Sequence, residues 1–213
     1  PTHHHSSAAS DVYKRQHDTL LLFSDRGVSY ALPAYRVPQC SRAAKGTPVV
    51  QLLPIPREEA ITSLLAVSEF NDDTDLLMLT SGGFIKRTRL SAFSNIRSNG
   101  LIAINLEEGD ALTWVRLAVP GDSVLICSKA GMTIHFRLSD EELRPLGRTA
   151  RGVRSMNLRE GDALVSMDVL PVELADQVAA SADDEEDAAS EGPWVLVASA
   201  LGLGKRVPVT QFR

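Results

Sequence analysis

Apolar and polar positions follow one pattern that recurs four times along this chain. Each copy has an apolar run of four or five residues, then Ser or Thr, two variable residues, a glycine and an alternating segment. Two short strands around a tight turn fit this pattern, because glycine tolerates the positive φ that such a turn requires. The sequence therefore predicts four β-hairpins, at residues 20–33, 75–90, 123–138 and 194–209, with the shared glycines at Gly27, Gly83, Gly131 and Gly202.

The first three hairpins are each followed by the same series of segments. A basic turn ends at Gly46, Gly100 or Gly152, and an apolar run follows at 47–53, 101–106 or 153–158, which we interpret as the third strand of the unit. An acidic turn and a last strand, at 61–67, 112–119 or 164–170, complete each unit. Residues 57–70 alone would also fit an amphipathic helix, but the matching segments of the next two units carry Gly-Asp turns and favour a strand.

Four strands in about 40 to 50 residues is typical of propeller blades. We expect an all-β fold, a β-propeller fragment within residues 17–213. It would have about three complete four-stranded blades, at 18–70, 75–119 and 123–173, and the start of a fourth at 194–213. Residues 1–16, with three histidines among Ser and Ala, are interpreted as a non-native or disordered lead. Residues 174–193 form an acidic, Ala- and Ser-rich insert that we expect to be disordered.

The composition narrows the class of protein. The net charge is −5, but the insert holds seven acidic residues and no basic one, so the remainder of the chain carries a net charge of +2. Cys40 and Cys127 lie far apart and in no Cys-x-x-Cys pattern, which favours a reducing cytoplasm over a secreted disulfide scaffold. No run approaches the ~20 apolar residues of a membrane span, and no leader resembles a signal peptide.

Basic side chains recur at equivalent positions of successive units. The basic turns have the pattern Arg-x-x-base-Gly, with Arg42 and Lys45 in the first copy and Arg148 and Arg151 in the third. The second has Arg97, one residue closer to its glycine, and lacks the other base. Equivalent turns of repeated blades emerge at equivalent points, so the pattern predicts an arc of positive charge along the rim. Arginine forks fit phosphate oxygens, and glycine lets backbone N–H groups approach an anion. Loop solubility explains any single base, but the repetition favours a rim that binds duplex nucleic acid through phosphate.

We expect the basic turns and the nearby hairpin bases to contact DNA. In a strand, Lys86 faces opposite to Arg87 and Arg89, so these three cannot all serve one surface. The candidate DNA-binding residues are Arg42, Lys45, Lys86, Arg87, Arg89, Arg97, Arg137, Arg144, Arg148, Arg151, Arg154, Lys205 and Arg206.

We find no motif for catalysis, metal binding or cofactor binding. The stretch "GLGKR" at 202–206 lacks the first glycine and the Ser or Thr of a phosphate-binding loop. The acidic run lacks the spaced ligands of a calcium loop, and His17 and His135 have no partners for zinc. We therefore assign no catalytic residue, no metal and no cofactor to this chain.

Four stretches, "SRAAKGTPVVQLLP", "GFIKRTRLSAF", "RTARGVRSMNLREGDALVSM" and "GLGKRVPVTQF", resemble the C-terminal domain of the DNA gyrase A subunit, part of a bacterial type IIA topoisomerase. The resemblance covers residues 18 to 213 except the insert. It implies a β-pinwheel, a six-bladed propeller variant whose basic perimeter wraps duplex DNA to support ATP-dependent negative supercoiling. This chain would be the second to fourth blades and the start of the fifth. The implied partners are duplex DNA, the DNA gyrase B subunit and a second A subunit, with ATP and Mg used elsewhere in the enzyme, in the nucleoid-associated cytoplasm.

This sequence departs from the family pattern in two respects. The Gln-Arg-Arg-Gly-Gly-Lys-Gly box of the first blade is not present, and the basic turns are weaker echoes of it. The catalytic tyrosine belongs to the family's N-terminal core, so Tyr13, Tyr30 and Tyr35 are not assigned its role. Two alternatives remain, the similar domain of the topoisomerase IV A subunit and a propeller that serves as a protein-interaction platform. The insert is either a solvated linker or a segment that competes with DNA for the basic rim.

Overall fold

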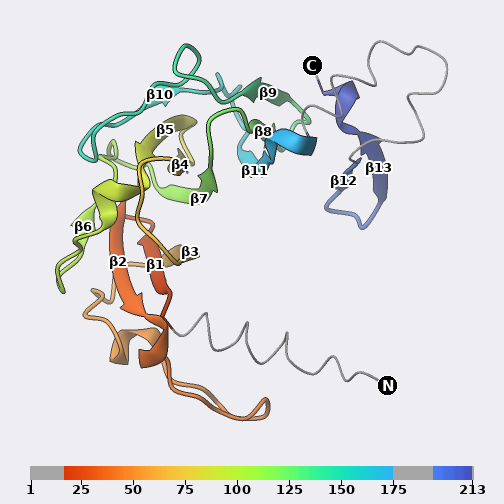
Figure 1. Cartoon of the computed structure of the whole chain (residues 1–213). Coiled ribbons are helices and arrows are strands. Elements are labelled where there is room, and N and C mark those ends of the chain that lie inside the picture. The colour runs from red at the N-terminus through yellow and green to blue at the C-terminus, as the bar shows by residue number, and fades with distance from the viewer. Residues whose placement is uncertain (1–16, 175–193, 213) are drawn as a thin grey trace, which may run out of the picture.

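The structure, a computed structural model, describes residues 17–174 and 194–212, and these form thirteen strands in four antiparallel sheets. The expected all-β fold is confirmed. Successive sheets follow one another along an arc, as propeller blades do (Figure 1). The expectations for residues 1–16 and 175–193 lie outside the described residues.

All four predicted hairpins are present. They pair β1 (Thr19–Ser24) with β2 (Val28–Pro33), β4 (Asp75–Thr80) with β5 (Phe84–Arg89), β8 (Ser123–Ser128) with β9 (Thr133–Arg137), and β12 (Trp194–Ala198) with β13 (Gly204–Pro208). In each turn the Ser or Thr hydroxyl accepts a hydrogen bond of 3.1 to 3.3 Å from the N–H four residues later. The glycine between them has φ from 76° to 86°. This local hydrogen bond accounts for the recurring Ser/Thr-x-x-Gly pattern.

The remaining strands complete each sheet from two different units. The last strand of each unit, β3 (Ile61–Val67), β7 (Leu112–Ala118) or β11 (Leu164–Leu170), pairs with the first strand of its own hairpin. The short strand after each basic turn pairs instead with the preceding unit: β6 (Leu101–Ile102) with β2, and β10 (Val153–Arg154) with β5. The sheet orders are thus β3-β1-β2-β6 and β10-β5-β4-β7. The expectation that each unit supplies all four strands of its blade is corrected accordingly.

The pairing of each short strand with the preceding unit also explains which predicted strands were wrong. Residues 47–53 form no strand; instead they contain the 3-10 helix η2 (Val49–Gln51), because the described residues contain no hairpin ahead of β1 for them to pair with. The sheet β11-β8-β9 has three strands and the sheet β12-β13 has two, since no following short strand covers β9 or β13 among the described residues. Three more 3-10 helices follow hairpins: η1 (Ala34–Arg36), η3 (Leu90–Phe93) and η4 (Val209–Gln211).

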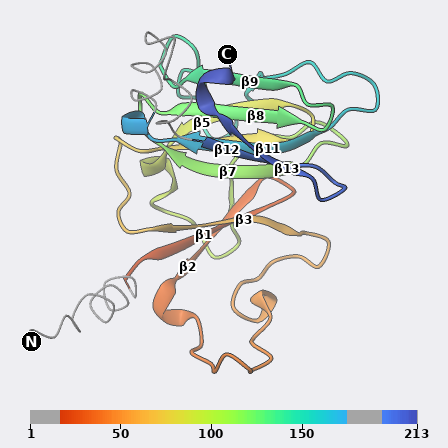
Figure 2. The ribbon, with the colours of Figure 1, turned by 90° about the vertical axis from the view of Figure 1, so that its right-hand side faces the viewer.

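The core lies between the sheets rather than within one of them. One buried cluster joins Leu21 and Phe23 of β1 to Leu76 and Met78 of β4, and a second joins Leu77 of β4 to strands of the third unit. Every residue of β4 is buried, so both faces of this sheet are interior. The strands β3 and β11 both contact β7, which places these strands on the inner side of the arc (Figures 1 and 2).

The repeated acidic turns close the hairpin turn of their own unit. The Asp110 carboxylate accepts hydrogen bonds from Gly82 N–H at 2.7 Å, Ser81 Oγ at 2.8 Å and Ala111 N–H at 2.8 Å. Burial acts to raise the pKa of Asp110, but these hydrogen bonds and one involving Thr80 hold it below its usual value. Asp162 accepts the equivalent bonds from Ala130 and Ala163 N–H. The Gly-Asp-Ala repeat is therefore a structural element of the fold.

We predict that Gly152 is required for docking of the third basic turn. Its φ is +100°, and a Cβ there would lie 2.4 Å from the Ile85 carbonyl oxygen, whereas at Gly161 (φ +79°) a Cβ meets nothing within 4 Å. Gly161→Ala should lower the free energy of unfolding by about 1 kcal/mol through backbone strain alone. Gly152→Ala should lower it by about 3 kcal/mol, because the turn must also leave β5. Urea denaturation followed by circular dichroism compares the two, and equal losses would contradict this account.

Candidate nucleic-acid interface

Two of the three basic turns lie at the outer edges of sheets. The second and third turns lead directly into β6 and β10, which are the outermost strands of their sheets. In Figure 1 these two strands lie on the outer side of the arc, opposite β3, β7 and β11. At Gly100 and Gly152 the turn packs directly on the preceding hairpin, so the glycine is needed for this contact as well as for any approach of an anion. Gly46 has no such neighbour, since its turn has no preceding hairpin to contact among the described residues.

Most of the expected DNA-contacting side chains are accessible. Arg89 and Arg148 are half-buried, and the exposed members are Arg42, Lys45, Arg97, Arg137, Arg144, Arg151, Arg154, Lys205 and Arg206. Six side chains form no ion pair and no hydrogen bond with any residue in 17–174 or 194–212: Arg42, Lys45, Arg97, Arg144, Arg148 and Lys205. These six are free to bind an anion.

Two arginines of the third unit are held beside the phenyl ring of Phe84. The guanidinium carbons of Arg151 and Arg154 lie 4.5 and 4.6 Å from the ring centroid. Arg151 also forms an ion pair with Glu107 of the second acidic turn. The aromatic contacts fix both cations at the sheet edge, and the Glu107 carboxylate occupies Arg151 where a phosphate would otherwise bind.

Lys86 and Arg87 are corrections to the expected interface, because both side chains are 0% exposed. The Lys86 ammonium donates hydrogen bonds to backbone carbonyls of the basic turn of the next unit. Arg87 Nε donates to Asp75 at 2.6 Å, and its Nη1 donates to Asp140 at 2.8 Å and to the Leu143 carbonyl at 3.0 Å. These two bases join consecutive units and cannot reach a phosphate.

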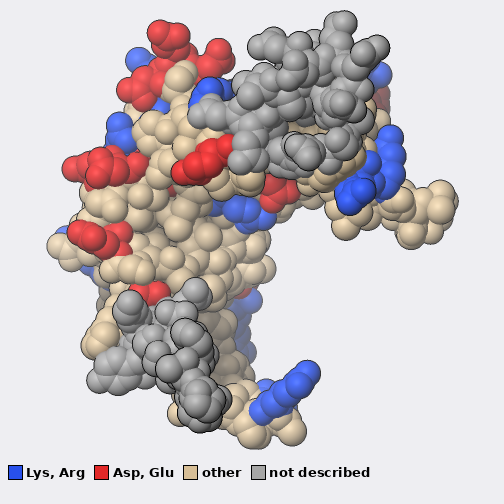
Figure 3. All heavy atoms as spheres, turned by 45° about the vertical axis from the view of Figure 1, so that its right-hand side comes forward, with Lys and Arg blue, Asp and Glu red and all other residues tan. Residues whose placement is uncertain are grey.

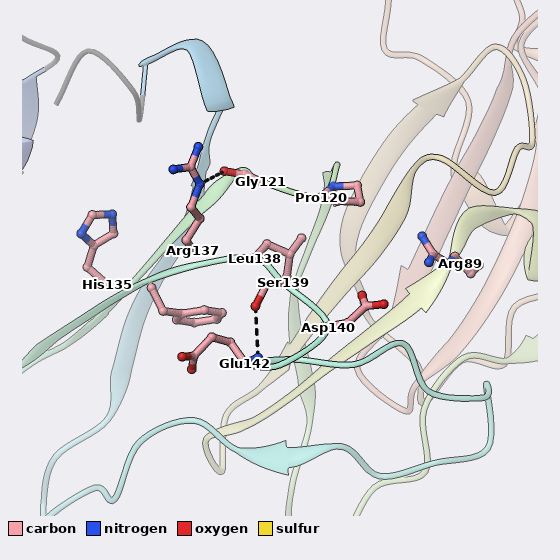
Figure 4. Close-up of a pocket in the computed structure, with 10 residues that line it drawn as sticks. Arg89, Pro120, Gly121, His135, Arg137, Leu138, Ser139, Asp140 and Glu142 are labelled. Atoms are coloured by element: carbon pink, nitrogen blue, oxygen red, sulfur yellow. Dashed lines mark hydrogen bonds between the residues drawn. The ribbon is translucent and has the colours of Figure 1, made fainter. Parts of the chain in front are cut away.

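Two other expected residues are engaged with the protein itself. Arg89 Nη1 donates to the Asp72 carbonyl at 3.0 Å and to Asp75 at 3.3 Å, and Arg137 Nε donates to the Gly121 carbonyl at 3.0 Å. Both line a hollow of about 990 Å³ beside β9, which Figure 4 shows with Asp140 and Glu142 among its lining residues. The carboxylates of Asp140 and Glu142 line this hollow together with the two arginines, so its charge is mixed and does not favour an anion.

Lys205 and Arg206 occupy the same register as Lys86 and Arg87. They stand three and four residues after the hairpin glycine in both cases, at Gly202 and Gly83. They are exposed because no strand covers the outer edge of β13 among the described residues. Arg206 packs instead on the Trp194 ring, at 4.5 Å from its centroid.

The charged side chains do not form a continuous basic band on the face seen in Figure 3. Blue Lys and Arg groups on this face lie apart from one another, and red Asp and Glu groups lie between them. In the part of the chain that the structure describes, no cluster of three or more His, Cys, Asp or Glu could hold a metal ion. No helix in that part is long and apolar enough to span a membrane.

Comparison with known proteins identifies the family. The model of the DNA gyrase C-terminal domain, a beta-propeller, matches residues 18–68, 74–118, 122–171 and 193–213. This chain belongs to the DNA gyrase C-terminal domain family. It is 56% identical over 210 residues to the DNA gyrase A subunit of Synechocystis sp., covering 92% of this chain and 24% of that protein. It is 39% identical over 198 residues to the DNA gyrase A subunit of Staphylococcus epidermidis, covering 92% of this chain and 20% of that protein.

Solved structures of two similar domains have the same fold. The C-terminal domain of DNA topoisomerase IV gives a TM-score of 0.74 at 26% identity, covering 93% of this chain and 55% of that one. The DNA gyrase A C-terminal domain gives 0.68 at 25% identity, covering 92% of this chain and 56% of that one. The β-pinwheel expected from the resemblance is thereby confirmed. The chain spans about half of these domains and about a quarter of the Synechocystis protein.

We predict that the buried pair of Arg87 and Asp75 contributes more to stability than the neighbouring pair of Arg89 and Asp75. Arg87→Met keeps most of the buried volume but leaves the Asp75 carboxylate, itself 0% exposed, without its main partner. The free energy of unfolding should fall by about 3 to 5 kcal/mol. Arg89→Met is the matched control; its side chain is 36% exposed, so the loss should stay below about 1 kcal/mol. Urea titrations of both variants test the difference, and similar losses would show that burial of the pair does not matter.

Proposed function

We propose that this chain is a DNA-binding and DNA-wrapping module of the DNA gyrase A subunit. The observation that carries the proposal is the placement of solvent-accessible bases in the second and third basic turns, at the outer edges of two successive sheets. A duplex that follows this edge would meet the second basic turn on the sheet β3-β1-β2-β6 and the third on the sheet β10-β5-β4-β7. Contacts to phosphate bind the duplex without reading its sequence and hold it along a curved path.

Different bases contribute in different ways to the proposed interface. Arg42 and Lys45 of the first turn, Arg97 of the second and Arg148 of the third are available without breaking any protein contact. Arg151 must exchange the Glu107 carboxylate for a phosphate, so it contributes less net affinity. Arg144 and Arg154 flank the third turn, and Lys205 and Arg206 extend the edge along the last hairpin.

The chain is proposed to act within the complete enzyme. There, wrapped DNA is presented to a cleavage core, and strand passage driven by ATP and Mg introduces negative supercoils. The DNA gyrase B subunit and a second A subunit are the proposed partners, and a nucleoid-associated cytoplasmic location is the proposed setting. The chain itself is assigned no catalytic step.

The curated relatives cited above favour gyrase, because both are gyrase A subunits, at 56% and 39% identity. The two solved domains do not discriminate, because the topoisomerase IV domain is 26% identical and the gyrase domain is 25% identical. A protein-interaction platform is the rival from another class. Such a platform would bind a partner protein through the exposed Leu196, Leu201 and Leu203 of the last hairpin. That binding would not depend on the salt concentration.

We predict that duplex DNA binds this chain with a steep salt dependence. Replacing Arg42, Lys45, Arg148 and Arg151 by Ala should weaken binding and reduce the slope of log K against log salt by about 0.9 for each phosphate left unbound. Fluorescence anisotropy with a labelled duplex, over a range of salt concentrations, measures both quantities.

The matched control is Arg159→Ala. Arg159 is an exposed base of the third acidic turn, and its charge acts on the Asp162 carboxylate of that turn. We expect this variant to keep the slope and affinity of the wild type. An unchanged slope in the four-residue variant would overturn the proposed interface.

A further inference from the structure

Lys86 places a buried ammonium group inside a cage of backbone oxygens. Its Nζ donates to the carbonyls of Arg148 at 2.5 Å, Ala150 at 3.2 Å and Gly147 at 3.3 Å, all in or next to the third basic turn. A further hydrogen bond goes to the Ala103 carbonyl in its own unit. Among the described residues no carboxylate pairs with Lys86. The buried ammonium group therefore holds the backbone carbonyls of the turn in place through these hydrogen bonds.

The cage determines which way the peptide units of the turn face. In a trans peptide the C=O and the N–H point in opposite directions. The carbonyls of residues 147, 148 and 150 converge on Lys86 in the interior, so the N–H groups that follow them, on Arg148, Thr149 and Arg151, point away from it. None of these three N–H groups has a hydrogen-bond acceptor in residues 17–174 or 194–212. Adjacent outward N–H groups are a binding arrangement for anions.

We propose that Lys86 is the positioning residue of a phosphate-binding turn: it gathers the carbonyls of the turn inward and thereby directs three N–H groups outward, toward a DNA phosphate. This inference rests on the proposed DNA-binding function. It adds main-chain N–H groups to the arginines as the groups of the third basic turn that would contact DNA. Arg87 supports the same segment from the adjacent position, because it holds Asp140 and the Leu143 carbonyl.

The arrangement depends on the proton of Lys86. Burial lowers the pKa of Lys86 from 10.5 to about 7, and the charge of Arg148 acts in the same direction. The other charged groups nearby are paired with each other, Arg87 with Asp75 and Asp140, and Arg151 with Glu107. A neutral amine has one N–H fewer and turns a lone pair toward the carbonyls, so the cage weakens as pH rises through about 7.

Stability and DNA affinity then respond to pH in opposite directions. The unfolded chain, with a lysine pKa of 10.5, binds more protons at this position than the folded chain does between pH 7 and 10.5. The contribution of Lys86 to the free energy of unfolding therefore rises with pH in this window, whereas its contribution to DNA binding falls. A buried lysine without a positioning role would not make DNA affinity fall while the free energy of unfolding rises with pH.

The test compares Lys86→Met with Lys45→Met, which removes an exposed, uncaged lysine from the first basic turn. Duplex affinity is measured at constant ionic strength from about pH 6 to about pH 9. We expect the wild type to lose about tenfold in affinity over this range, a difference typical of one charged hydrogen-bond network. Lys86→Met should bind weakly at all pH values and show a flatter profile. Lys45→Met should bind more weakly than the wild type but keep its pH profile. A Lys86→Met profile parallel to the wild type would overturn the positioning role.

A second measurement uses only the wild-type chain, in case Lys86→Met does not fold. NMR follows the Lys86 Cε resonance with pH, and the amides of Arg148, Thr149 and Arg151 on addition of the duplex. We expect the amides to shift on DNA addition at low pH, and their DNA-free positions to titrate with the Lys86 midpoint. Amides that are indifferent to both DNA and pH would refute the inference, even if the chain binds DNA with the expected salt slope. Absence of duplex binding by the wild type at low salt would instead refute the proposed function.

Discussion

The sheet edge shared between consecutive units is the contact on which the rest of this structure depends. The second strand of a hairpin exposes one row of main-chain groups, and the following unit covers it with a short strand, β6 on β2 or β10 on β5. Hydrogen bonds beyond the strands extend the contact, from Leu146 N–H to the Arg87 carbonyl at 2.7 Å and from Ser155 N–H to the Gly83 carbonyl at 2.8 Å. Since bare strand edges are unfavourable, each covered edge ties the position of one unit to the next.

This shared edge also sorts the basic side chains into structural and exposed groups. Where the edge is covered, as on β5, the Lys-Arg pair at 86 and 87 is enclosed and holds the incoming segment. On β13, whose outer edge no strand covers among residues 17–174 and 194–212, the same pair at 205 and 206 reaches solvent. The glycine and the Lys-Arg pair are common to both hairpins, so the exposure of the two bases depends on whether a neighbouring strand covers them.

The features that the sequence predicted well are those that depend on contacts within a few residues. Each hairpin turn is closed by a hydroxyl and an N–H four residues apart, which is why the Ser/Thr-x-x-Gly repeat located all four hairpins. The wrong predictions, the strand at 47–53 and the accessibility of Lys86 and Arg87, concern contacts between units. Alternation along β5 could not reveal the burial of both faces, because the second face is covered by residues more than 50 positions away. The sequence did contain one sign of this burial. Asp75 stands at the start of an apolar run, where a carboxylate needs a buried basic partner, and Arg87 is that partner.

The modest charge of the chain makes this geometry the decisive factor for an anionic ligand. The residues outside the acidic insert carry a net charge of only +2, and acids lie between the bases on the face in Figure 3. With so small a net charge, a uniform positive field contributes little to holding a duplex. A bound duplex would instead be held by a few groups fixed at a set spacing, and the shared edge supplies that spacing because the second and third basic turns are each docked on a rigid hairpin. A ligand held at separate points along an arc must bend to reach all of them, so the coupling that stabilises the fold is also what would give a bound duplex its curvature.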